Sequence, residues 1–510
     1  MFSIGVLCTS NLPGQDTLKS LAFKNNRPTR NTVSFYQPDL SYKLWEQFAL
    51  IQEANSGNVE AQHELGLRYL TGHDVPADTL KGAYWIKKAA EQKFPPAEYN
   101  YGILLINGWG VEWDPYKAFQ YFYLAALQDM AAAEYVIGLI YTDDLIIKRN
   151  MAEAYKWVKK AANDNLPQAK ESLAKLMRFA PAVNDSIPKL TEKSGKKNTK
   201  EDNDQSSLKS SSGLVFIDFD MISDSIPKIT YTDLLEDLKN TSNKSLENCL
   251  KYTKDSTLYV DSTSISTFSD ASDYGSPEAL NILGDYLQNG IWLKKDLVAA
   301  AEFYIRSSKV DSRKGSILLY NLIKEKDFYL NLKKEVDRNN SDALYVWYGL
   351  YSLGLDHQIT EGDAINFLRK STASNNMNAI VEMGLNYFKG QYVKQDKQKA
   401  VEIWNMAMKS GNKEARIRFE IANLFNEIDL KDKNDSFNYL NDVEGKGSIL
   451  AQLSLADCYF QGIIVPRNQA KAVYYFRLAA VRGSLYAYNQ LKKIYEEIKP
   501  VGFEATLNKQ

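Results

Sequence analysis

An alanine returns every 36 residues along most of this 510-residue chain. The column is occupied by Ala61, Ala97, Ala133 and Ala169, and after a gap by Ala343, Ala379, Ala415, Ala451 and Ala487. A fixed period of this size is typical of a helical solenoid, in which each repeat buries its apolar face against its neighbours. The period therefore predicts an all-α fold: an α-solenoid of stacked antiparallel helix pairs with extended surfaces for binding.

The first helix of each repeat is predicted from two further columns. Five residues after the alanine position stand Gly66, Gly102, Gly138, Gly284 and Gly384. Small residues at both places allow two helices to approach closely. Eleven residues after the alanine position, the helix is expected to end, because the residues there accept a left-handed backbone. They are Gly72, Gly108, Asp144, Gly290, Gly354, Gly390, Asn426 and Gly462.

The second helix is expected to begin seventeen residues after the alanine position. Every residue there is a good N-cap: Asp78, Asp114, Asn150, Asp296, Thr360, Asp396, Asp432 and Asn468. Two apolar columns follow in this helix. The first is Trp85, Tyr121, Trp157, Phe303, Phe367, Ile403, Tyr439 and Tyr475, and the second is Ile86, Phe122, Val158, Tyr304, Leu368, Trp404, Leu440 and Phe476. At helical spacing, such stripes indicate core packing rather than a ligand cage.

This combination of columns resembles the Sel-1-like repeat family, which is related to the tetratricopeptide repeats. The clearest copy begins Ala97-Glu-Tyr-Asn-Tyr-Gly and continues through Asn107-Gly-Trp-Gly-Val-Glu-Trp-Asp-Pro-Tyr-Lys-Ala. The resemblance covers residues 41–180 and 271–510. It implies an adaptor or scaffold that binds partner proteins or peptides, since family members commonly act in complex assembly, quality control and signalling. Some relatives instead activate membrane or organellar enzymes, which gives a second hypothesis.

The columns divide the chain into four parts. Residues 1–40 are expected to be a disordered tail, and 41–180 a first array of three full repeats with flanking helices. Residues 181–270 are expected to be a Ser/Thr/Lys/Asp-rich linker, with 190–213 disordered because they have almost no apolar content. Residues 271–510 form the second array of about six repeats. Its unit at 315–342 is eight residues short, which predicts a kink or irregular packing, and residues 487–510 are expected to be a closing helix.

Two details of the linker stand out. The segment Asp185–Thr191 recurs almost unchanged as Asp224–Thr230. The copies are either a pair of docking or phosphorylation-controlled peptides or a chance duplication in rapidly changing sequence. Leucines between Tyr231 and Lys251 predict one or two short amphipathic helices that pack back onto an array.

Composition excludes several classes of function. The net charge is −1, so nothing indicates binding of nucleic acid. The three cysteines, Cys8, Cys249 and Cys458, are far apart, which excludes a CxxC metal pair and fits a reducing compartment. No membrane span is expected, because no run of apolar residues is long enough. A cytoplasmic location is expected; the weakly basic residues 1–38 leave the mitochondrial matrix as the alternative.

No catalytic, cofactor-binding or metal-binding residue emerges from the sequence, and we do not expect an enzyme. His63 and Glu64 begin like a zinc-protease motif, but the position of the second histidine is Leu67. We therefore expect His63 to be a residue of the helix surface. Candidate groove positions lie two residues after the alanine, at Tyr99, Tyr135 and Tyr345, with buried packing as the equal alternative. The binding residues stay unknown at this level.

Overall fold

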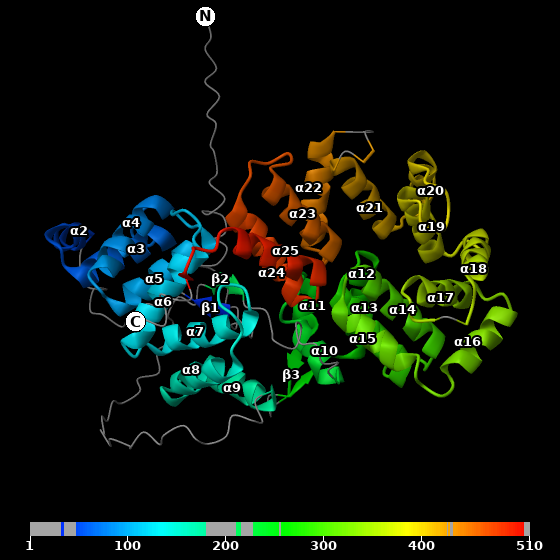
Figure 1. Cartoon of the computed structure of the whole chain (residues 1–510), viewed down its shortest axis with the longest axis horizontal. Helices are drawn as coiled ribbons and strands as arrows, with labels where there is room; N and C mark the ends of the chain where they lie inside the picture. The colour runs from blue at the N-terminus through cyan, green and yellow to red at the C-terminus, as the bar shows by residue number, and fades with distance from the viewer. Residues whose placement is uncertain are drawn as a thin grey trace, which may run out of the picture. The chain divides into compact units, whose positions relative to one another are not determined.

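A computed structural model of the chain describes residues 32–34, 47–179, 211–215, 228–253, 257–356, 358–425, 427–428 and 432–503. It divides into two compact units, which we describe separately. Unit 1 comprises residues 1–218 and 493–510, and unit 2 comprises residues 219–492. In both units, the described residues form mainly helices, which pack in antiparallel pairs (Figure 1).

Unit 1 is a stack of helices joined by short turns. Its helices are α2 (Gln47–Ser56), α3 (Val59–Thr71), α4 (Thr79–Glu91), α5 (Pro95–Asn107), α6 (Pro115–Leu127), α7 (Ala131–Asp143), α8 (Met151–Asn163) and α9 (Pro167–Phe179). A small antiparallel ribbon joins β1 (Thr32–Ser34) to β2 (Ser211–Val215). These strands lie in segments for which the sequence analysis expected disorder. Short runs containing Val and Thr suffice for a two-stranded pairing.

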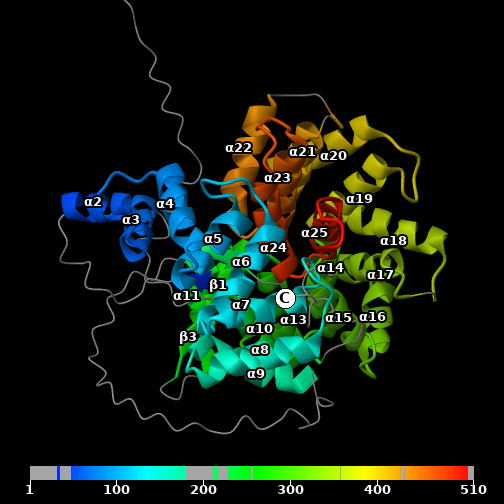
Figure 2. The same ribbon diagram turned by 60° about the vertical axis from the view of Figure 1, so that its left-hand side comes forward.

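Unit 2 begins with a small insert before its helix pairs. The insert holds α10 (Tyr231–Asp237), α11 (Lys244–Cys249), the paired strands β3 (Lys251–Tyr252) and β4 (Leu258–Tyr259), and α12 (Ile265–Asp273) after a 3₁₀ turn. The predicted short helices between 231 and 251 are thus confirmed. Both α10 and α11 supply leucines to the core of unit 2, and α10 lies beside α13 (Figure 2). Residues 228–270 are therefore largely ordered, although the sequence analysis placed them in a linker.

The helix pairs of unit 2 then follow one another. They are α13 (Pro277–Asn289), α14 (Leu297–Lys309), α15 (Arg313–Leu322), α16 (Phe328–Asp337), α17 (Ser341–Ser352), α18 (Glu361–Ala373), α19 (Met377–Lys389), α20 (Lys397–Lys409), α21 (Lys413–Leu424), α22 (Lys433–Glu444), α23 (Ile449–Gln461) and α24 (Gln469–Val481). The predicted closing helix is present as α25 (Leu485–Glu497). From Lys493 onward the chain belongs to unit 1, where the hydroxyl of Tyr116 donates to the carbonyl oxygen of Tyr495.

The columns of the sequence have the predicted structural roles. All nine alanines of the column are fully buried. All eight predicted N-caps cap the second helices, each by accepting a hydrogen bond from a backbone N–H through its side chain. A positive φ occurs at seven of the eight predicted helix ends, while Asn426 lies outside the described residues. Local backbone chemistry therefore sets where the helices begin and end.

The glycine column lets the two helices of a repeat pack closely. A methyl group at Gly66, Gly102, Gly138, Gly284 or Gly384 would lie closer than 3.0 Å to the side chain twenty residues later. Those side chains are Ile86, Phe122, Val158, Tyr304 and Trp404, all members of the second apolar column. In the degenerate repeat, Glu420 replaces this glycine and its carboxylate accepts a hydrogen bond from the Ser436 hydroxyl at 2.7 Å. Each glycine is thus a contact point between paired helices.

The short repeat packs irregularly, as predicted. Its helices α15 and α16 have ten residues each, whereas most helices of the array have thirteen. Consequently α14 packs directly against α17.

Candidate functional site

The three candidate groove tyrosines are packing residues. Tyr99, Tyr135 and Tyr345 each expose only 2% of their surface. The ring of Tyr99 meets that of Phe122 edge to face at 5.7 Å, and the hydroxyl of Tyr135 lies 2.9 Å from that of Ser172. Burial raises the pKa of Tyr345 well above its usual range. Of the two alternatives from the sequence, buried packing is the one that the structure shows.

His63 is also buried, so the expectation of a surface residue was wrong. Only 1% of its surface is exposed, and its ring meets Phe94 edge to face. The side-chain amide of Asn100, in the next repeat, donates to Nε2 at 2.8 Å. Burial lowers the pKa of His63 to about 3. The neutral imidazole therefore links two repeats.

An open groove of about 320 Å³ lies on unit 1 between α4 and the loop before α6. Its most exposed apolar side chains are Leu80 and Tyr84 on α4, which expose 64% and 54% of their surface. Buried Tyr101 and Leu105 of α5 line it as well. This volume is typical of pockets that accept a ligand or a few side chains of a partner.

The walls of the groove are set by one glycine and the charges around it. Gly110 has φ 67°, and a Cβ at this position would collide with the carbonyl oxygen of Thr79. The loop can therefore approach the start of α4 closely. Lys87 and Lys117 add basic groups to the lining, and Glu112 adds an acidic group. The result is an apolar centre with a polar rim of both signs.

The sequence analysis missed this groove, although one pattern could have indicated it. Leu80 and Tyr84 are spaced four residues apart and lie outside both apolar columns of the second helix. They therefore form an additional apolar stripe on the outer side of α4. Nothing in the packing of the repeat requires that stripe.

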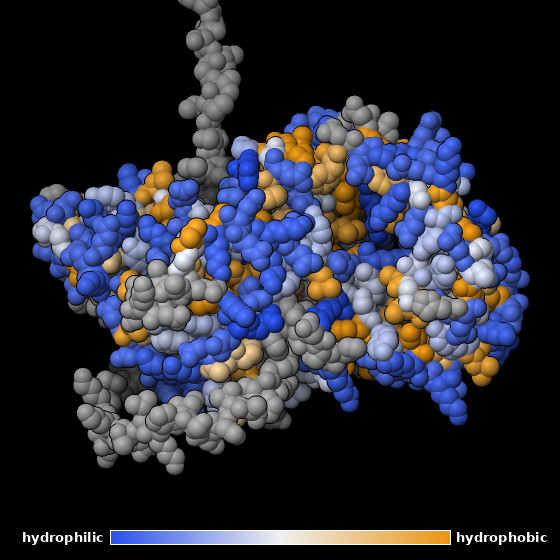
Figure 3. Space-filling model, in the orientation of Figure 1, coloured by the Kyte–Doolittle hydropathy of each residue, from blue (hydrophilic) through white to orange (hydrophobic). Residues whose placement is uncertain are grey.

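A second feature is a largely buried group of paired charges between α14 and α19 of unit 2, in which the side chains of Lys309 and Glu382 are each 12% exposed. The ammonium group of Lys309 on α14 lies 2.5 Å from Glu382 on α19 and 5.0 Å from the ring centre of Tyr348. Two turns earlier on α14, Glu302 accepts a hydrogen bond from the side-chain amide of Asn378 on α19 at 2.5 Å. Burial raises the pKa of Glu302 to about 7 and lowers the pKa of Lys309. Figure 3 shows the viewed face of unit 2 hollowed beside α21.

Among the described residues, no group of His, Cys, Asp or Glu is arranged to hold a metal ion. Within the same residues, no helix is both long and apolar enough to cross a membrane. The cysteines Cys249 and Cys458 are free and buried, and Cys8 lies outside the described ranges. His357 lies outside them too. Of the two features described above, the groove of unit 1 has exposed apolar side chains, whereas the paired charges of unit 2 are largely buried.

Comparison with known families identifies the repeats. The model of the Sel1 repeat matches residues 59–94, 95–130, 131–166, 277–311, 378–412 and 449–484. The chain contains six Sel1 repeats. In unit 1, each Sel1 match begins two residues before an alanine of the column. In unit 2, the helix pairs α17–α18 and α21–α22 belong to the same stack but lie outside the residues that match the Sel1 model. Proteins built of Sel1 repeats generally serve as scaffolds for protein interaction.

Two solved structures are similar to this Sel1-repeat chain. One is a protective antigen of uropathogenic Escherichia coli strains that displays an SLR fold; it is 18% identical, and the match covers 90% of this chain and 92% of that one, with a TM-score of 0.29. The other is a Sel1 repeat protein from Oxalobacter formigenes; it is 30% identical over 25% of this chain and 96% of that one, with a TM-score of 0.24. The superpositions are poor, so the assignment depends on the six repeat matches.

Proposed function

We propose that this protein is a non-catalytic scaffold that binds a segment of a partner protein in the groove of unit 1. The observation that carries the proposal is the exposure of Leu80 and Tyr84 beside a groove of about 320 Å³. Large apolar side chains in such a setting are the usual centres of binding energy in protein interfaces. A location in the cytoplasm stays a prediction from the sequence.

The chemistry of the groove indicates the kind of segment. Leu80 and Tyr84 offer apolar contact, while Lys87, Lys117 and Glu112 can pair with charged or polar side chains at its edges. A partner segment with one or two large apolar residues and flanking polar residues fits this arrangement. The second array of helix pairs, in unit 2, would allow the same chain to hold a second segment or a second partner.

The test compares two variants of the full chain that differ only in position. Leu80→Glu places a charge in the groove, and Leu127→Glu places the same charge on α6 at a leucine that exposes 51% of its surface and does not line the groove. Each variant and the natural chain are crosslinked in cells and purified, and the bound proteins are quantified by mass spectrometry. Circular dichroism checks that all three proteins are folded.

The proposal predicts that Leu80→Glu loses a defined set of partners at least tenfold, whereas Leu127→Glu keeps them. In the natural chain and in Leu127→Glu, crosslinks to these partners should map to Lys87 or Lys117. If both variants keep the same partners, the groove is not the binding site. Equal losses in both variants would show that the loss of partners does not depend on the groove, which would also contradict the proposal.

A further inference from the structure

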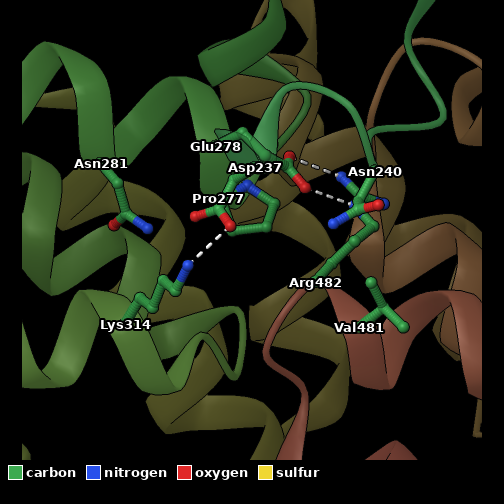
Figure 4. A pocket seen from close by; sticks show the side chains of 8 residues that line it. All are labelled: Asp237, Asn240, Pro277, Glu278, Asn281, Lys314, Val481 and Arg482. Atoms are coloured by element: carbon green, nitrogen blue, oxygen red, sulfur yellow. Dashed lines mark hydrogen bonds and ion pairs between the residues drawn. The ribbon is translucent and has the colours of Figure 1, made fainter. Parts of the chain in front are cut away.

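The array of unit 2 closes on itself, because its first and last Sel1 repeats are in contact. Arg482, in the turn after α24, donates from Nε and Nη2 to the two carboxylate oxygens of Glu278 on α13, at 2.7 and 3.0 Å. Both side chains are almost completely buried, with 0% and 3% exposure. The same guanidinium group also donates to the carbonyl oxygen of Gly447 at 2.6 Å and to Gln452 at 3.2 Å. Figure 4 shows this ion pair from close by.

A short row of hydrogen bonds continues the contact beside Arg482. The backbone N–H of Arg313 donates to the carbonyl oxygen of Gly483 at 3.0 Å, and Ser312 pairs with Ser484 as an antiparallel bridge. Asp311 accepts from the Ser484 hydroxyl at 2.5 Å and from the backbone N–H of Tyr486 at 2.9 Å. We call Glu278 and residues 311–313 on one side, with residues 482–486 on the other, the seam.

The seam differs in chemistry from the stacking of the repeats. Neighbouring repeats bury alanine, leucine and aromatic side chains, whereas the seam consists of an ion pair and of hydrogen bonds made by backbone groups and the Asp311 carboxylate. Beside the seam, the side chains of Ser242 and Asn243 also donate to the carbonyl oxygens of Glu444 and Lys446. Beside it lies a small cavity of about 10 Å³, about the room of one water molecule, lined by polar groups that include Asp237, Asn281 and Lys314 (Figure 4). A polar contact next to a polar cavity that is large enough for one water molecule can be exchanged for water with little loss of apolar burial.

We propose that unit 2 is a closed array that opens at the seam, with Arg482 as the latch. This opening does not depend on the function proposed for the groove of unit 1. One aromatic contact also spans the closure, because Tyr274 before α13 packs in a cluster with Ile417 of α21 and Cys458 of α23. Opening would withdraw Tyr274 from this cluster and should make its fully buried Cys458 more accessible.

Native-state hydrogen exchange on the full chain, without any partner, tests the opening. The backbone amides of Arg313 and Tyr486 should give the same free energy of opening, because one event exposes both. Both amides should exchange faster than the amide of Ile282 inside α13. Alkylation of Cys458 by iodoacetamide, located by mass spectrometry, should follow the same opening. If the seam amides exchange only as slowly as Ile282, unit 2 opens by global unfolding alone and the proposal fails.

Variants of the latch sharpen this test. Arg482→Met leaves the buried Glu278 without its partner and should accelerate exchange at the seam by about 100-fold. Arg482→Lys keeps the charge but cannot donate two parallel hydrogen bonds to Glu278, so it should accelerate exchange at the seam less than Arg482→Met. It also serves as the test variant if Arg482→Met does not fold. The matched control is Arg338→Met, because Arg338 forms an exposed pair with Glu335 on α16. Equal exchange in Arg482→Lys and Arg338→Met would overturn the role of Arg482.

A disulfide across the seam provides the opposite perturbation. Directly paired residues of an antiparallel bridge have Cα atoms about 4.5 to 5.5 Å apart, which is suitable for a disulfide. The double variant Ser312→Cys/Ser484→Cys should therefore slow the alkylation of Cys458 when oxidised, and added reductant should restore it. Unchanged alkylation in the oxidised form would mean that Cys458 becomes accessible without opening of the seam. That result would refute the latch while leaving the groove of unit 1 untouched.

Discussion

Replacing Gly102 by alanine should destabilise the protein, although alanine is the better helix former. A Cβ at Gly102 of α5 would lie 2.7, 2.9 and 3.0 Å from three ring atoms of Phe122 on α6. The shortest of these is about 0.7 Å inside the 3.4 Å at which ordinary contact begins. Phe122 is fully buried, so its ring cannot move away without disturbing other core side chains.

The expected magnitude follows from two opposing effects. Overpacking of a dense core costs about 1–3 kcal/mol, while Gly→Ala within a helix gains up to about 1 kcal/mol. We therefore expect Gly102→Ala to lower the free energy of unfolding by about 1–2 kcal/mol. Gly362→Ala is the matched control, because this exposed glycine of α18 has open space around it, with the nearest atom at 3.7 Å. It should stabilise by about 0.5 kcal/mol.

The assay is urea unfolding of the full chain, followed by far-ultraviolet circular dichroism. Opposite signs for the two variants are the expected result, and Gly102→Leu should cost several times more than Gly102→Ala. A second variant locates the cause: adding Phe122→Leu to Gly102→Ala should give a loss about 1 kcal/mol smaller than the sum of the single losses. Stabilisation by Gly102→Ala, or strict additivity with Phe122→Leu, would refute the assigned contact.

Three further predictions concern other parts of the fold. Because the pKa of His63 is lowered from 6.5 to about 3, the unfolded state binds more protons below pH 6.5. Stability should therefore fall by about 2 kcal/mol between pH 6.5 and 4.5, and His63→Gln should remove this loss, as measured by urea unfolding at both pH values. Leu235→Ala in α10, a residue 1% exposed, should cost about 2–5 kcal/mol, whereas Leu330→Ala, at an exposed leucine of α16, should cost less than about 0.5 kcal/mol; equal thermal stability of the two would exclude α10 from the core. Ile464→Asn should stabilise by about 0.5–1 kcal/mol, because a β-branched residue at φ 64° is strained and asparagine accepts that conformation; a lower melting temperature would contradict the strain.

The features that could be predicted from the sequence are those set by short stretches of chain. Asp78 and Asp396 predict the first residue of a helix, because their side chains accept hydrogen bonds from the free backbone N–H groups of the first turn. Gly72 predicts a helix end, because its backbone adopts the left-handed conformation. Each of these residues acts within a few positions of itself. Repetition at a constant spacing then makes even weak local preferences decisive, which is why the helix pairs could be placed.

The environment of a polar side chain could not be predicted in the same way. His63 lies two residues after Ala61, in the column of Tyr99, Tyr135 and Tyr345, for which buried packing was one of two alternatives; only its polar side chain favoured the helix surface. Its partner Asn100 is 37 residues away, one repeat later. The inner charges of unit 2 are similar, because Lys309 and Glu382 are 73 residues apart. Such pairs depend on how repeats are rotated against one another, and the sequence period does not contain that rotation.

The direct contact between α14 and α17 occurs where the period is interrupted by the short repeat. The short helices α15 and α16 let α14 pack directly on α17, and this brings Asn378 and Glu382 of α19 within reach of Glu302 and Lys309. With a full-length repeat between them, those side chains would be separated by one more layer of helices. The shortened repeat thus lets side chains of α14 and α19 form an ion pair and a hydrogen bond although 73 and 76 residues separate the partners. A period read from the sequence locates the short repeat, but not the contacts that it makes possible.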